Sequence, residues 1–116
     1  MKSTFLGHNY PLLTAMIEMG KPDDVIKRMY CAIKDGADAF GLELNRLPFE
    51  YLNEETLKRI FEGAGGLPIY VTCYRKGSTE SLCDEERERI LMKAVRAGAV
   101  LVDIMGDFYD PVTVEF

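Results

Sequence analysis

Apolar and polar residues along this chain alternate with two periods, one typical of strands and one typical of helices. Four short apolar stretches predict strands, at residues 11–19, 39–45, 67–75 and 100–106. Three longer segments between them repeat apolar residues at helical spacing and predict helices, at residues 21–36, 52–66 and 83–99. Strands that alternate with helices of this length indicate a parallel sheet with right-handed crossovers. We therefore expect an α/β fold built from parallel βα units.

The ends of the predicted helices carry residue types that begin and end helices. Pro22, followed by two aspartates, suits the start of the first helix, and Asn53 is the candidate N-cap of the second. Gly36 and Gly98 are candidate helix ends. The stretches IKDGADAFGLEL and VRAGAVLVDIM both run from a helix through Gly-Ala into an apolar strand that carries an acid. This similarity is a weak internal repeat of one βα unit.

Two architectures of parallel βα units compete. An open doubly wound sheet fits 116 residues, but IEMGKPDD after the first strand is not a G-x-G-x-x-G turn. A closed barrel of eight βα units needs about 250 residues, and four strands make half of it. Because DFYDPVTVEF adds no covering helix, four strands alone would leave open edges and a bare apolar face. We predict half of a TIM-type eight-stranded barrel, with residues 1–116 as one partial domain without a linker, which pairs with a second copy or with a missing C-terminal half.

Composition narrows the classes of function. A net charge of −5 argues against nucleic-acid binding, and no apolar run approaches the roughly 20 residues of a membrane span. The first residues, MKSTFLGHNYPLL, do not read as a signal peptide. Three cysteines without a C-x-x-C pair favour a reducing cytoplasm. Because His8 is the one histidine, zinc ligands are scarce and we expect no metal site.

Polar residues recur at the carboxyl ends of the predicted strands, where functional groups gather in βα folds. The candidates are Glu18, Glu43 with Asn45, Arg75 and Asp103. Three strands thus deliver an acid at one level, and one delivers an arginine. A cluster of these charges at one end of the sheet suits a small polar or anionic substrate that is held by arginine and oriented by carboxylates. The competing interpretation is that some of these charges cap helices or form structural ion pairs.

Three stretches of the chain, GADAFGLELNR, PIYVTCYR and VDI, carry a resemblance to a known family. In this order they resemble the N-terminal half of the type I 3-dehydroquinate dehydratases, which are barrel lyases of the shikimate pathway. The resemblance spans essentially all 116 residues. The family's motifs at these places are E-x-R, a strand that ends in T-x-R, and V-D-x-E.

Glu43 matches the glutamate of E-x-R, and Asn45 stands at its arginine with Arg46 next to it. Tyr74 stands at the arginine of T-x-R, with Arg75 one place later. At the last position of V-D-x-E the chain has Met105, and the family's E-G-G loop is absent from KGSTES.

The resemblance implies a Schiff base between a lysine and the substrate ketone, with a histidine that moves protons as water is lost to give 3-dehydroshikimate. The protonated imine is an electron sink, which acidifies the neighbouring C–H bond. No cofactor is implied, and the lysine and histidine are expected beyond residue 116, so this chain alone should be inactive. From the strand ends and the resemblance together, the predicted substrate contacts are Glu43, Arg75, Asn45, Arg46, Glu18 and Asp103. The alternatives are another barrel lyase or aldolase acting on a small oxo acid, and a non-catalytic half-barrel binding domain.

Overall fold

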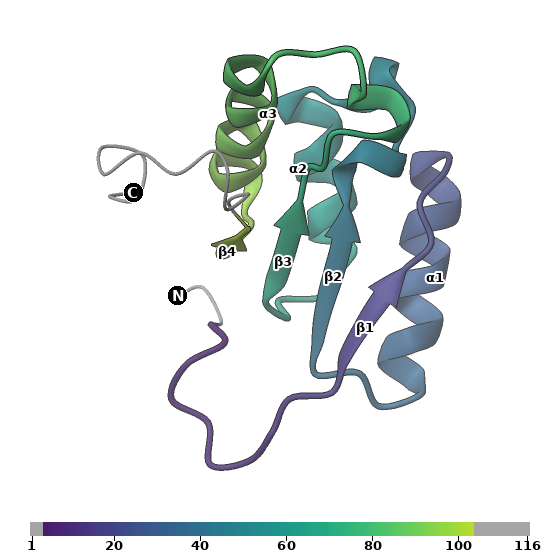
Figure 1. The fold of residues 1–116 in the computed structure, drawn as a ribbon. Coiled ribbons are helices and arrows are strands. Elements are labelled where there is room, and N and C mark those ends of the chain that lie inside the picture. Colours follow the sequence, from purple (N-terminus) through teal and green to yellow (C-terminus); the bar gives the residue numbers. More distant parts are fainter. Residues whose placement is uncertain (1–3, 104–116) are drawn as a thin grey trace.

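Four parallel strands form a single sheet in the order β1-β2-β3-β4 in the computed structural model, which describes residues 4–103 (Figure 1). The strands are β1 (Thr14–Ile17), β2 (Ala39–Glu43), β3 (Ile69–Thr72) and β4 (Leu101–Val102). One helix connects each strand to the next: α1 (Pro22–Lys34), α2 (Glu54–Glu62) and α3 (Asp84–Ala97). The predicted α/β fold of parallel βα units is therefore confirmed.

The local signals at the helix ends act as the sequence predicts. Asn53 caps α2, because its Oδ1 accepts a hydrogen bond of 2.8 Å from the backbone N–H of Thr56. The two predicted helix-to-strand joints also share one geometry. Gly36 and Gly98 adopt positive φ angles of 98° and 131°, and the alanine after each donates its N–H back to the carbonyl five residues earlier. Glycine adopts this backbone conformation without a steric penalty, which explains its place in both joints.

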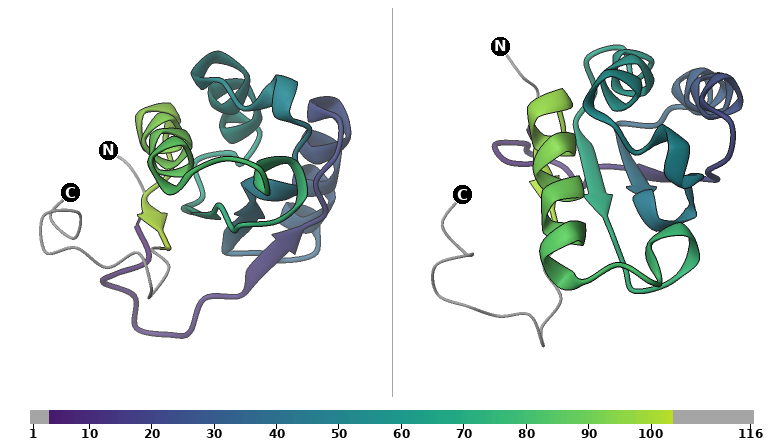
Figure 2. Two further views of the ribbon diagram at one scale, coloured as in Figure 1. Left: turned by 45° about the horizontal axis from the view of Figure 1, so that its top comes forward. Right: turned by 90° about the horizontal axis from the view of Figure 1, so that it is seen from above.

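The three helices lie side by side over one face of the sheet, and the core fills the space between the two layers (Figure 2). Alternate residues of the central strands point into this core, namely Phe40, Leu42, Ile69 and Val71. The predicted apolar stripe of α2 is buried against them, at Leu57, Ile60, Phe61 and Ala64. Cys73 continues the alternation of β3 and is buried, as predicted for a core residue; burial raises the pKa of its thiol.

The opposite face of the sheet carries a row of residues that pair across all four strands. Met16 lies opposite Gly41, Gly41 opposite Tyr70, and Tyr70 opposite Leu101. Met16 lies directly over Gly41, since a Cβ at that glycine would come within 2.2 Å of the methionine sulfur. Met16 is 60% exposed and Leu101 47% exposed. We call this row the open-face row.

The observed elements are shorter than predicted where a strand leads into a loop. The strand predicted to reach Asn45 ends at Glu43, because the chain turns into a 3₁₀ helix, η1 (Leu44–Arg46). A second, η2 (Phe49–Tyr51), precedes α2, and a third, η3 (Gly77–Thr79), lies in the predicted KGSTES loop. The prediction for residues 104–106 of the last strand, and Met105 with it, lies outside the described residues. No helix within residues 4–103 is long and apolar enough to cross a membrane.

Candidate functional site

The backbone register brings the carboxyl ends of the strands to one level. Glu43, the last residue of β2, pairs with Thr72, the last residue of β3. Val71 pairs with Val102, so Asp103 follows at the level of Thr72, and the N–H of Asp103 donates to the carbonyl of Val71 at 3.2 Å. We call Glu43, Thr72 and Asp103 the carboxyl-edge row.

Glu18 extends β1 by one residue to the level of Glu43, because Ile17 pairs with Leu42. The contact that fixes this residue is made by its backbone, whose carbonyl accepts a hydrogen bond of 3.0 Å from Arg28 Nη1 of α1. The residue itself is exposed. Its predicted role in substrate contact stays a prediction.

Arg46 folds back onto Glu43. Its Nε lies 2.6 Å from Glu43 Oε2, in a partly exposed ion pair. A continuing strand would place Arg46 on the other face of the sheet, but the η1 turn ends the alternation after Glu43. The pair therefore joins two predicted site residues, and it leaves the Glu43 carboxylate with a neighbouring positive charge.

Asn45 is fully buried and holds two loops together. Its Oδ1 accepts a hydrogen bond of 3.2 Å from the backbone N–H of Tyr74, and its carbonyl accepts one from Ser78 Oγ at 3.2 Å. The backbone of Gly77 lies against the same carbonyl, so closely that a Cβ there would sit 2.1 Å from the Asn45 oxygen. These contacts give Asn45 a structural role between η1 and the loop after β3.

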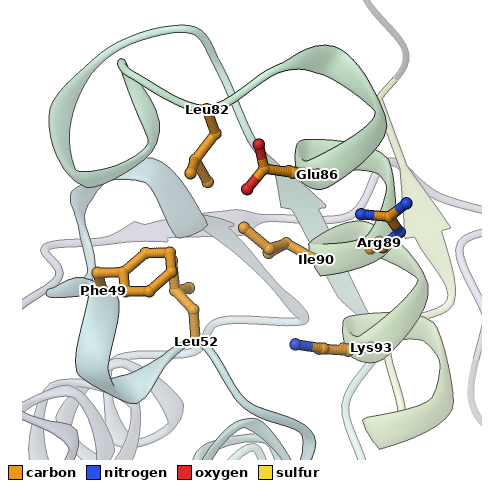
Figure 3. A pocket seen from close by; sticks show the side chains of 7 residues that line it. All are labelled: Phe49, Leu52, Leu82, Glu86, Arg89, Ile90 and Lys93. Carbon is orange, nitrogen blue, oxygen red and sulfur yellow. The ribbon is translucent and has the colours of Figure 1, made fainter.

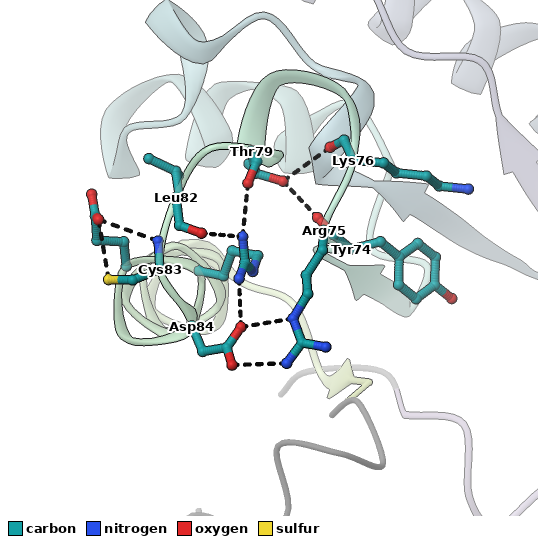
Figure 4. Close-up of polar contacts among 9 residues, drawn as sticks. Tyr74, Arg75, Lys76, Thr79, Leu82, Cys83 and Asp84 are labelled. Carbon is teal, nitrogen blue, oxygen red and sulfur yellow. Dashed lines mark hydrogen bonds and ion pairs between the residues drawn. The ribbon is translucent and has the colours of Figure 1, made fainter.

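Arg75 belongs to an ion cluster at the start of α3 (Figure 4). Its guanidinium binds the Asp84 carboxylate at two points, with Nε–Oδ1 at 2.9 Å and Nη2–Oδ2 at 2.8 Å. The buried Arg87 binds the same carboxylate and donates to the carbonyls of Thr79, at 2.8 Å, and Leu82. The two guanidiniums hold the pKa of Asp84 well below its usual range. For Arg75, the competing interpretation of a structural ion pair thus has direct support.

Tyr74 and Arg75 leave the chain in different directions (Figure 4). Tyr74 Oη donates a hydrogen bond of 3.4 Å to Asp103 Oδ2. Tyr70 lies next to Asp103 and Tyr74. Burial raises the pKa of Tyr70 to about 12, with further contributions from the charge of Asp103 and from Tyr74. The structure therefore gathers two phenols around Asp103 of the carboxyl-edge row.

Sequence reasoning missed Tyr70 and Thr72 as site residues, although the sequence contains the signal. In IYVTCY the apolar residues Ile69, Val71 and Cys73 alternate with Tyr70, Thr72 and Tyr74. Period-two alternation predicts one apolar and one polar face for this segment. The polar face is the one that carries the carboxyl-edge row.

A separate groove of about 180 Å³ lies in the helical layer (Figure 3). It runs between the segment that contains η2 and the first turns of α3, and its lining residues are Phe49, Leu52, Leu82, Glu86, Arg89, Ile90 and Lys93. None of the six predicted substrate contacts lines it. The groove and the carboxyl-edge row are thus two different places in the molecule.

The chemistry available at the carboxyl-edge row is hydrogen bonding by carboxylates and hydroxyls. No lysine or histidine lies on β1, β2, β3 or β4. Within residues 4–103, no three histidine, cysteine, aspartate or glutamate residues are placed to hold a metal ion together. Comparison of the chain with protein-family models and with curated proteins finds no match.

Proposed function

We propose that this chain is the substrate-binding half of a barrel lyase similar to the type I 3-dehydroquinate dehydratases. The observation that carries the proposal is the carboxyl-edge row, in which Glu43 and Thr72 end β2 and β3 and Asp103 follows β4 at the same level. Active sites of βα barrels form at this end of the strands. The motifs GLELNR, VTCYR and VDI, on which the resemblance rests, come from the same three strand ends.

In this proposal the four strands are half of an eight-stranded barrel, and the open-face row of Met16, Gly41, Tyr70 and Leu101 faces the barrel interior. Further βα units would bring the lysine that forms the imine and the histidine that moves protons. The part described here binds and orients the substrate. Glu43 accepts hydrogen bonds from substrate hydroxyls, and the adjacent Arg46 holds the carboxylate in place through their ion pair.

A second candidate is a non-catalytic domain that binds a small molecule at the same edge. It is favoured by one observation, the two-point contact of Arg75 with Asp84, which holds this arginine against α3. A lyase or aldolase with a different oxo-acid substrate would fit the same edge. Imine formation separates the lyases and Schiff-base aldolases from the binding domain, and the choice of ketone separates the enzymes from one another.

Borohydride trapping tests the proposed function. The full-length protein that contains this chain is incubated with 3-dehydroquinate and sodium borohydride, and its intact mass is measured. We expect a covalent adduct, because borohydride reduces an imine to a stable amine. Absence of the adduct, with the protein folded, would contradict the lyase proposal and leave the binding domain.

Glu43→Gln provides the matched variant, since it keeps the size of the side chain and removes its charge. We expect weaker binding of the substrate and an unchanged free energy of unfolding. If the variant instead has a lower free energy of unfolding and the folded variant binds the substrate normally, Glu43 stabilises the fold and does not contact the substrate.

A further inference from the structure

The carboxyl-edge row contains a buried hydroxyl whose hydrogen-bonding capacity is not used within the described part of the chain. Thr72 is 2% exposed, and its Oγ1 has no hydrogen-bond partner there. Strand alternation places it on the same face of the sheet as Tyr70 and Glu43. It lies between two acids, because Glu43 and Asp103 stand level with it on the neighbouring strands. Buried hydroxyls in proteins are nearly always hydrogen-bonded, so this unused hydroxyl points to a further partner at the strand ends.

The groups around Thr72 suit one kind of partner. Glu43 and Asp103 bring negative charge, and Tyr74 brings a phenol that is hydrogen-bonded to Asp103. Arg46 contacts Glu43, and Arg75 contacts Asp84 at the start of α3. Carboxylates and hydroxyls bind neutral hydroxyl groups well, since a hydroxyl both donates and accepts. They repel a second carboxylate.

We propose that Thr72, Tyr74 and Asp103 form a subsite for neutral vicinal hydroxyl groups, and that Tyr74 determines its specificity. Asp103 orients the phenol of Tyr74, and Thr72 supplies a second hydrogen bond from β3. The carboxylate of the ligand then lies elsewhere, on the part of the barrel that is not formed by these strands. This inference rests on the proposed function, because it names the side of the substrate that this edge contacts.

Two ligands separate recognition of hydroxyls from recognition of a carboxylate. Quinate carries ring hydroxyls and a carboxylate, and cyclohexanecarboxylate carries the carboxylate alone. Binding of both to the full-length protein is measured by titration calorimetry for the wild type, Tyr74→Phe and Thr72→Val. Tyr51→Phe is the matched control, because Tyr51 is another partly buried tyrosine that packs against the core from η2.

We expect Tyr74→Phe and Thr72→Val each to weaken quinate binding by about 3- to 10-fold, the usual effect of losing one neutral hydrogen bond. Binding of cyclohexanecarboxylate should change less than twofold in both variants, and Tyr51→Phe should leave both ligands unaffected. Thr72→Val keeps the shape of the side chain and removes a buried hydroxyl, so it should unfold at the same denaturant concentration or a higher one. A purely structural role for Thr72 would give normal quinate binding.

The outcomes distinguish this inference from the proposed function. Quinate binding that is unchanged in both variants overturns the hydroxyl subsite, and the borohydride adduct then still supports the lyase. Equal loss of both ligands also overturns it, because the two residues would then act on the common carboxylate. A wild-type protein that binds no quinate and forms no adduct with 3-dehydroquinate overturns both proposals.

Discussion

Tyr74 and Arg75 are adjacent in the sequence, yet the structure uses them in different places. Tyr74 points to Asp103 at the strand ends, and Arg75 points to Asp84 at the start of α3. The divergence follows the end of β3 at Thr72, after which the chain bends at Arg75. The residue type that suits an anion therefore stabilises a helix start, and the phenol takes the position at the carboxyl edge.

Ionisation of Tyr70 is a test of the group that Tyr70, Tyr74 and Asp103 form. Its pKa is raised from 10.0 to about 12, first by burial and then by the charge of Asp103. We expect the difference between the ultraviolet titrations of the wild type and Tyr70→Phe to show a tyrosine that ionises near pH 12. In Asp103→Asn this pKa should fall but stay above 10.0, since burial remains.

The same shift makes stability depend on pH. Between pH 10 and pH 12 the folded protein keeps the Tyr70 proton while the unfolded chain loses it, so the free energy of unfolding falls as pH rises through this window. Tyr70→Phe should lose stability less steeply over the same range in denaturant titrations. An ordinary pKa for Tyr70, unchanged by Asp103→Asn, would contradict the contact between the two side chains.

At the scale of the elements, the sequence predicts the kinds and order of helices and strands well and the loops poorly. Apolar spacing and capping residues are local signals, so the buried stripe of α2 and the Asn53 cap could be read directly. The 3₁₀ turn of η1, which brings Arg46 back to Glu43, could not. It depends on Asn45, whose amide oxygen and backbone carbonyl bind groups of the loop after β3, about thirty residues away. Such a contact exists only once β2 and β3 are paired.

Substitution of Gly77 tests how tightly the loop after β3 is fixed, and Gly41 in β2 provides the comparison. Gly77 has a φ of +64°, and a Cβ there would meet the backbone oxygen of Asn45 at 2.1 Å, so Gly77→Ala is strained in two ways. We expect it to lower the free energy of unfolding by about 1–3 kcal/mol in urea titrations. Gly41 is the matched control. A Cβ there collides with the flexible end of the exposed Met16 and makes an ordinary contact of 3.7 Å with the Tyr70 ring, so Gly41→Ala should change stability by less than about 1 kcal/mol.

If the two substitutions had equal effects, the loop after β3 would be free to move away from Asn45. Tyr74 would then lose the hydrogen bond that fixes its backbone.

At the scale of the whole molecule, the sheet has two faces, and helices cover only one of them within residues 4–103. The helices cover the core face, whereas Met16 and Leu101 on the opposite face are exposed to solvent. Both edge strands, β1 and β4, also have one side that no other strand pairs with within residues 4–103. Exposed strand edges next to apolar side chains favour association with further strands.

A second copy of the chain could cover the open face and pair with the free edges of β1 and β4. All strands run parallel, so β4 of one copy can pair with β1 of another, and two such contacts close a ring of eight strands around the two open-face rows. We therefore expect the isolated 116-residue chain to sediment at about twice its mass of 13.1 kDa. Sedimentation equilibrium over a range of concentrations measures this directly.

Leu101→Lys places a charge on the open-face row and should shift the chain towards the monomer, because a lysine amine inside the closed ring would lose its hydration. The control is Tyr30→Lys on α1, since Tyr30 is 58% exposed but lies on the helical layer. It should leave the mass of the assembly unchanged. A wild-type chain that stays monomeric at every concentration would show that the open face is stable in water, and the half-barrel proposal would then lose its physical basis.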